Sequence, residues 1–204
     1  MDIRNTQLHP NQVFHIYNRG INGMAVFFED KNYRFFLNQL ARYVLPFSQV
    51  YAYCLLKNHF HFLIKVRDEL ELDKAISQNK EKPYYWHVSN GFSSFLKSYT
   101  RAVNKVYDRS GPLFEPKFKR IHIDNDYYFS RLIMYIHHNP VKHGIVPDFK
   151  KYPHSSYLAH TSTAPTRLER NEVLGWFGGV EQYISFHQKD DSNELPEVLR
   201  GESL

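Results

Sequence analysis

The chain has few of the residues on which several structural classes depend. Cysteine occurs once among 204 residues, which excludes a framework of disulfide bonds within the chain. That residue, Cys54, lies in the apolar run 50–56, where we expect a small buried side chain in a reducing compartment. No apolar run approaches the roughly 20 residues needed to cross a membrane, and residues 1–5 lack the apolar stretch of a signal peptide. We therefore expect a cytoplasmic protein with no membrane partner.

The overall composition is that of an ordered globular protein. Hydrophobic residues make up 42% of the chain and charged residues 23%, both near the averages for soluble domains. A net charge of +5 favours polyanionic partners. The aromatic fraction is 16%, and such rings either fill a core or stack on the bases of single-stranded nucleic acid. Composition is thus compatible with a nucleic-acid-binding protein and with many ordinary basic proteins.

The spacing of apolar residues predicts a mixed order of strands and helices. The predicted strands cover residues 13–17, 50–56, 59–66 and 113–123, and the predicted helices cover residues 30–44, 91–109 and 127–143. The order β-α-β-β-α-β is typical of the ferredoxin-like fold, an α+β class in which helices pack on one face of an antiparallel sheet. The final predicted helix is an addition to that pattern.

Two segments lie outside this order of strands and helices. Residues 67–90 are polar and mixed in charge, which predicts an inserted flexible loop. Residues 1–147 are then expected to form the main domain, and residues 148–204 a loop-rich carboxyl-terminal appendage with short helices near 170–177 and 180–187. The last sixteen residues, from Lys189, hold five acids against two bases, and we expect them to be disordered.

A His-x-His pattern lies on the second strand of the predicted hairpin. Alternation along a strand places His59 and His61 on one face and the intervening Phe60 on the other. Side chains two residues apart rise roughly 6.6 Å along a strand, so two imidazoles can converge on one cation. Neutral imidazole binds several divalent metals. A pair of half-exposed strand histidines without a metal is the alternative.

The last predicted helix carries a tyrosine beside its apolar stripe. The stripe consists of Phe129, Leu132, Ile133 and Ile136. Tyr135 lies roughly 110° from the centre of this stripe at 100° per residue, which predicts a position at its flank. Asn139 follows one turn later on the same side. The phenol and the amide therefore face the same space, unless they are only a rim tyrosine and an asparagine that ends the helix before Pro140.

Basic residues form a stripe on the preceding helix. Its members, at successive i+4 steps, are Lys97, Arg101, Lys105 and Arg109, and the strand that follows adds Lys117, Lys119 and Arg120. Phosphates could neutralise this stripe. A solvated helix face is the alternative.

Four segments together resemble one known family. They are residues 15–20 (HIYNRG), 56–64 (LKNHFHFLI), 111–119 (GPLFEPKFK) and 135–144 (YIHHNPVKHG). This set is similar to the HUH single-tyrosine transposases, especially the REP-associated tyrosine transposases, over about residues 14–146. The resemblance implies a ferredoxin-like sheet with the nucleophile on an added helix. It also places Arg19, in the first segment, among the DNA-contacting residues.

The resemblance further implies a reaction and a site. Tyr135 would be the nucleophile that forms a covalent 5′-phosphotyrosine, and His59 and His61 would hold Mg²⁺ or Mn²⁺. Asn139 would be a third metal ligand, at a position where many relatives carry Gln. The substrate would be single-stranded DNA beside a hairpin, cleaved and rejoined in DNA transposition.

Three other functions remain open at this point. A related protein could bind hairpin DNA without cutting it, a ferredoxin-like module could bind RNA, and a replication initiator could use the same chemistry. A monomer and a homodimer both remain open as well.

Overall fold

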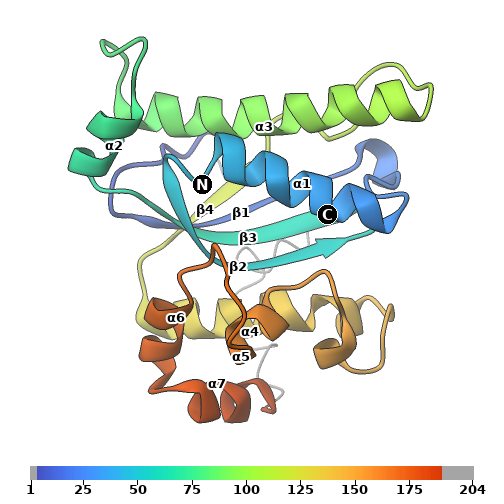
Figure 1. The fold of residues 1–204 in the computed structure, drawn as a ribbon, viewed down its shortest axis with the longest axis vertical. Helices are drawn as coiled ribbons and strands as arrows, with labels where there is room; N and C mark the ends of the chain where they lie inside the picture. The colour runs from blue at the N-terminus through green and yellow to red at the C-terminus, as the bar shows by residue number, and fades with distance from the viewer. Residues whose placement is uncertain (1–3, 190–204) are drawn as a thin grey trace.

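The computed structural model describes residues 4–189, which are built around one four-stranded sheet (Figure 1). The strands are β1 (Val13–Arg19), β2 (Ser48–Leu56), β3 (His59–Val66) and β4 (Lys119–Ile123). They lie in the order β2-β3-β1-β4, and each neighbouring pair is antiparallel. The predicted α+β class with an antiparallel sheet and an added helix is therefore confirmed.

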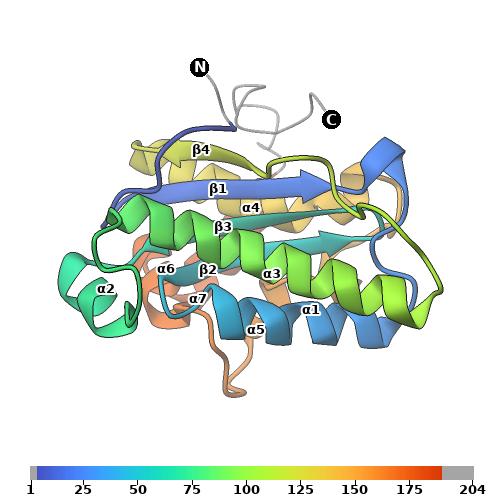
Figure 2. The same ribbon diagram turned by 90° about the horizontal axis from the view of Figure 1, so that it is seen from above.

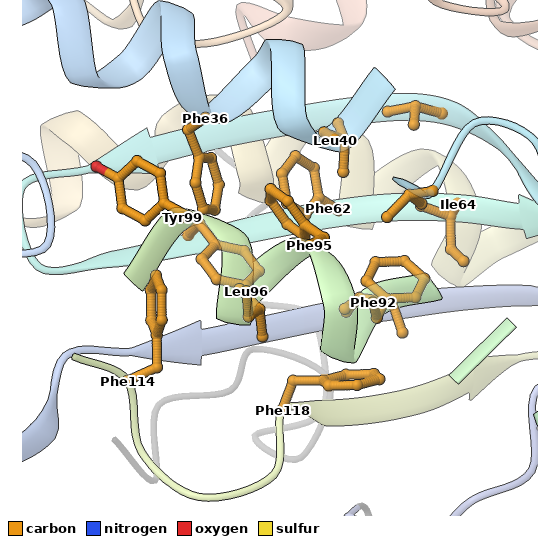
Figure 3. Close-up of a cluster of buried hydrophobic side chains, with 14 of the residues drawn as sticks. Phe36, Leu40, Phe62, Ile64, Phe92, Phe95, Leu96, Tyr99, Phe114 and Phe118 are labelled. Atoms are coloured by element: carbon orange, nitrogen blue, oxygen red, sulfur yellow. The ribbon is translucent and has the colours of Figure 1, made fainter. Parts of the chain in front are cut away.

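Helices α1 (Asp30–Tyr43) and α3 (Tyr84–Val106) cover the first face of the sheet (Figure 2). Their apolar stripes meet the phenyl rings of β3 in an aromatic core, which Figure 3 shows in close-up. The Phe36 and Phe95 rings lie 4.5 Å apart between their centroids, and both are fully buried. The Tyr99 hydroxyl donates a hydrogen bond to the Val26 carbonyl at 2.7 Å. Burial of these rings, which is the largest source of stability for aromatic side chains, holds both helices on the sheet.

Helix α4 (Asp126–Lys142) covers the second face. Leu132, Ile133 and Ile136 pack against the side of β2 that carries Cys54, which is buried as predicted. Outside α4 lie α5 (Tyr157–Thr161), α6 (Arg170–Phe177) and α7 (Val180–His187), and the bounds of the last two are those expected from the sequence. Residues 149–187 thus complete a second core, with helices on both faces of the sheet.

The prediction of a flexible loop over residues 67–90 is wrong. This segment forms α2 (Glu69–Ala75) and the first two turns of α3. The Asp68 carboxylate caps α2 by accepting a hydrogen bond from the Glu71 N–H at 2.8 Å. Pro83 precedes α3, where its lack of an N–H does no harm because the first helical N–H groups have no partner. Helix α3 therefore begins at Tyr84 rather than at residue 91. The missed signal in this segment was Asp68, the capping residue of α2.

The fourth strand is shorter than predicted. Residues 113–118 form no regular strand, because Phe114 makes an isolated bridge to Gly20 and Lys117 has a φ of 58°. The expected disorder of the tail lies, from residue 190 on, outside the described residues. Among the helices of residues 4–189, none is long and apolar enough to cross a membrane.

Candidate active site

His59 and His61 lie on the face of β3 that α4 covers. The phenyl rings of Phe60 and Phe62 point into the opposite core, as strand alternation predicts. The two imidazole centroids are 5.2 Å apart, and the side chains are 7% and 1% exposed. Both rings are therefore buried and not half-exposed.

The imidazole of His59 has a defined tautomer. Its Nδ1 lies 2.7 Å from Asn58 Oδ1, an atom that can only accept, so Nδ1 carries the proton and donates. The Asn58 Nδ2 donates to the Gly23 carbonyl at 3.3 Å, which agrees with this amide orientation. His59 Nε2 therefore holds a lone pair, and it is buried without a hydrogen-bond partner. A buried polar atom without a partner is costly, which makes His59 Nε2 a candidate ligand atom.

The imidazole of His61 is engaged at the same ring position. Its Nδ1 lies 2.9 Å from Nε2 of His15, a buried residue on β1. This leaves Nε2 as the ring nitrogen available to a cation. Burial lowers the pKa of His59 to about 3 and that of His61 well below its ordinary value, and neighbouring histidines lower both. Both rings are therefore neutral near pH 7, which is the form that binds metals.

Helix α4 brings a phenol to the imidazole of His61 and carries an amide one turn later. The Tyr135 and His61 rings meet edge to face, with centroids 5.9 Å apart. The Asn139 Nδ2 donates to the Tyr135 carbonyl at 2.9 Å, and Asn139 Oδ1 is buried without a partner. The structure thus brings His59, His61 and Tyr135 together, and Asn139 is joined to Tyr135 within α4. The expected flank position of Tyr135 is wrong, because the side chain is only 2% exposed between the sheet and the Lys142 ammonium, which lies 4.7 Å from the ring centroid.

Two further residues of this site were missed by sequence reasoning. His143 lies one helical turn beyond Asn139, and its ring centroid is 4.8 Å from that of His59. It lines a cavity of about 490 Å³ together with Gly23, Ala25, Lys57, Asn58, His59 and Ile145. Tyr17, on β1, is fully buried with its ring 5.7 Å from that of His61, and its hydroxyl has no partner. The i+4 spacing from Asn139 was the available signal for His143.

The basic residues expected near the fourth strand divide between the two faces of the sheet. Lys119 lies on the histidine face, where it is 5% exposed and its Nζ lies 5.4 Å from the Tyr17 ring centroid. Within residues 4–189 it makes no hydrogen bond or ion pair, and burial lowers its pKa. Arg19 pairs with Glu115 at 2.5 Å near the same face. Arg120 lies on the other face, where its Nη1 donates to Ser89 Oγ at 2.9 Å. This hydrogen bond joins β4 to α3.

The stripe on α3 lies on the side of the sheet opposite to Tyr135. Its exposed members Lys97 and Arg101 line a cavity of about 480 Å³ between α3 and residues 111–118, which Lys117 also lines. Lys105 is exposed outside this cavity, and Arg109 donates to Asn104 Oδ1 at 3.3 Å beyond the end of α3. The segment 111–118 connects this cavity with the histidine face of the sheet, because its Glu115 contacts Arg19.

The donor atoms present fit a cation held partly by an amide. Among the described residues, no group of three or more His, Cys, Asp or Glu side chains is arranged to hold a metal ion. A site here therefore depends on Asn139 Oδ1 as the third protein donor beside the two imidazole Nε2 atoms. Two of these three atoms, His59 Nε2 and Asn139 Oδ1, are buried without partners, so their lone pairs are available to a cation.

Comparison with known proteins rests on structure alone. No family model matches the chain, and no curated protein matches it. One solved structure, a REP-associated tyrosine transposase bound to a REP hairpin, superposes with a TM-score of 0.60 at 16% sequence identity. The match covers 81% of this chain and 89% of the other. The chain has the fold of a REP-associated tyrosine transposase.

Two other solved structures superpose less well. Two structures of a bacterial tRNA(His) guanylyltransferase-like protein, with ATP and with GTP, superpose with TM-scores of 0.38 and 0.36. Their identities are 12% and 13%, over 72% and 71% of this chain and 67% and 73% of theirs. These scores are too low to support an argument about this chain.

Proposed function

We propose that this protein cleaves and rejoins single-stranded DNA beside a hairpin, with Tyr135 as the nucleophile and a divalent metal at His59 and His61. The supporting observation is the edge-to-face contact of the Tyr135 ring with His61, one of two neutral imidazoles whose centroids lie 5.2 Å apart and whose Nδ1 atoms are each engaged by a neighbour. The transposase fold agrees with this assignment, since the neighbour of that fold is bound to a REP hairpin. The proposed setting is DNA transposition.

The donor set suits Mn²⁺ or Mg²⁺. His59 and His61 would supply Nε2 and Asn139 would supply Oδ1, and the nitrogen donors favour Mn²⁺ over Mg²⁺. When bound, the cation would polarise the scissile phosphate and offset the negative charge that grows on its oxygens.

Tyr135 would perform the covalent step. Its oxygen attacks phosphorus, a bond forms between them, and the bond from phosphorus to the 3′ oxygen breaks. The phenol gives up its proton, and the leaving strand ends in a 3′-hydroxyl. A second 3′-hydroxyl reverses these events and reseals DNA without ATP. Because Tyr135 is buried in the free protein, substrate entry requires the covering Lys142 side chain to move.

Lys119 would receive a phosphate of the bound strand. Its ammonium makes no hydrogen bond or ion pair among the described residues, and a phosphate oxygen could accept a charge-assisted hydrogen bond from it. The register of the sheet places Lys119 opposite Tyr17, which in turn is opposite His61. Lys119 therefore lies about 10 Å from the histidine column, at two strand spacings. The cavity between α3 and residues 111–118, with Lys97, Arg101 and Lys117, would hold a second stretch of backbone, for which we propose the hairpin.

The test is covalent capture of DNA. The full chain is incubated with a labelled oligonucleotide that carries a REP hairpin and single-stranded flanks, with Mn²⁺. We expect a covalent adduct that resists denaturing electrophoresis, none from Tyr135→Phe, and an undiminished adduct from Tyr128→Phe on the same helix. Mass spectrometry of the adduct should place DNA on Tyr135 rather than on Tyr17, the other tyrosine beside His61.

The competing function has a clear outcome in the same assay. Hairpin binding without an adduct, in Mn²⁺ and in Mg²⁺, would favour a protein that binds hairpin DNA and does not cut it. Stronger binding of the matched RNA hairpin would instead favour an RNA-binding module.

A further inference from the structure

His15 lies beneath the imidazole of His61 and contacts it directly. The pairing of β1 with β3 places His15 on the same face as His61, and the residue is fully buried. The two rings are stacked with centroids 5.1 Å apart and planes 21° apart, and Tyr17 stacks on both. His15 Nε2 and His61 Nδ1 are separated by 2.9 Å, a hydrogen-bond distance. Stacking and the hydrogen bond together restrict the orientation of the His61 ring.

This hydrogen bond also bears on the tautomer of His61. A neutral imidazole has one N–H and one lone pair, so a ring that binds a cation through Nε2 carries its proton on Nδ1. That proton needs an acceptor, and the atom at hydrogen-bond distance is His15 Nε2. Asn58 Oδ1 has the same relation to His59 Nδ1. The two imidazoles are thus each supported by a neutral acceptor rather than by a carboxylate.

We propose that His15 is a positioning residue that holds His61 in the Nδ1–H tautomer, with Nε2 directed to the metal. This inference rests on the proposed function, because it assigns His61 to a metal. Acceptors of this kind orient metal-binding histidines, and their loss weakens metal affinity by about 10- to 100-fold. A neutral acceptor also leaves the positive charge of the cation undiminished by a nearby carboxylate, so more of it acts on the phosphate.

The first experiment measures Mn²⁺ affinity of the full chain without DNA, by electron paramagnetic resonance of the free ion. His15→Phe keeps an aromatic ring for stacking and removes the acceptor, and we expect binding about 10- to 100-fold weaker. His15→Gln restores an acceptor near the position of Nε2 and should recover most of the affinity. His122→Ala, on β4, removes a histidine from the opposite face and should leave affinity unchanged. If His15→Phe does not fold, His15→Met replaces it in the comparison with His15→Gln.

The second experiment reads the tautomer without metal. Nitrogen-15 NMR of the imidazoles should show His61 as the Nδ1–H form in the wild type and as a mixture in His15→Phe. Wild-type affinity in a folded His15→Phe protein, or an Nε2–H form of His61 in the wild type, would overturn the inference. Failure of the wild type to bind Mn²⁺ would overturn the metal site itself, whereas loss of DNA cleavage with intact Mn²⁺ binding would overturn only the proposed reaction.

Discussion

Acid should loosen the packing of the carboxyl-terminal helices on α4 through two buried histidines. His187 on α7 donates from Nδ1 to the Tyr183 carbonyl at 2.8 Å, and its Nε2 lies 2.9 Å from His137 Nδ1. His160 on α5 contacts the Tyr183 hydroxyl at 3.0 Å. Burial lowers the pKa of His160 to about 4 and that of His187 to about 3, against an ordinary value of 6.5. The Arg170 charge also lowers the pKa of His160, and neighbouring histidines also lower that of His187.

The direction of the pH effect follows from these values. Below pH 6.5 the unfolded chain binds protons that the folded chain excludes, so acid favours unfolding. The free energy of unfolding is undiminished above pH 6.5 and falls as the pH drops from 6.5 toward about 4 for His160 and about 3 for His187. One pH unit below 6.5, each group lowers it by about 1.4 kcal/mol, and both together by about 3 kcal/mol. This is a large part of the roughly 5–15 kcal/mol that stabilises a typical domain.

Urea unfolding at pH 7.5 and pH 5.5, with a chelator present, measures this effect. The wild type should lose at least about 3 kcal/mol between the two pH values, and His187→Gln should lose about 1.4 kcal/mol less than the wild type. His9→Gln, at an exposed position, is the matched control. An identical pH difference in His187→Gln and in the wild type would show that His187 takes up no proton on unfolding, and the argument from burial would be refuted.

Two further substitutions test the site and its support. Gly20→Ala should lower the free energy of unfolding by about 1–3 kcal/mol in urea, because a Cβ would overlap the Met24 carbonyl oxygen, whereas Gly175→Ala, where a Cβ meets no atom within 4 Å, should not lower it. Lys119→Met should weaken binding of the hairpin oligonucleotide, because it removes the ammonium on the histidine face that is proposed to contact a phosphate. Lys97→Met, on the exposed stripe, should change the stability of the free protein by less than about 0.5 kcal/mol. Hairpin binding by Lys119→Met as tight as that of the wild type would contradict the proposed phosphate contact.

Local periodicity was enough to predict which side chains of the candidate site share a face. Alternation along a strand separates His59 and His61 from Phe60, and a spacing of four residues places Asn139 beside Tyr135, whatever the rest of the chain does. The order of elements and the antiparallel sheet followed from the same patterns. Residues 67–90 were misread because their polarity outweighed a single capping residue, Asp68, which marks a helix start.

The tertiary structure alone decided which groups meet across long distances in sequence. The contact between His15 and His61 joins positions 46 residues apart, and it depends on a strand register that packing of both faces sets. Packing likewise enclosed Tyr135, because α4 lies between the sheet and the carboxyl-terminal helices rather than at a surface. The sequence by itself determined which side chains share a face of each element. The burial of those faces against one another determined which imidazoles became neutral, which polar atoms were left without a hydrogen-bond partner, and which ring lies beside Tyr135.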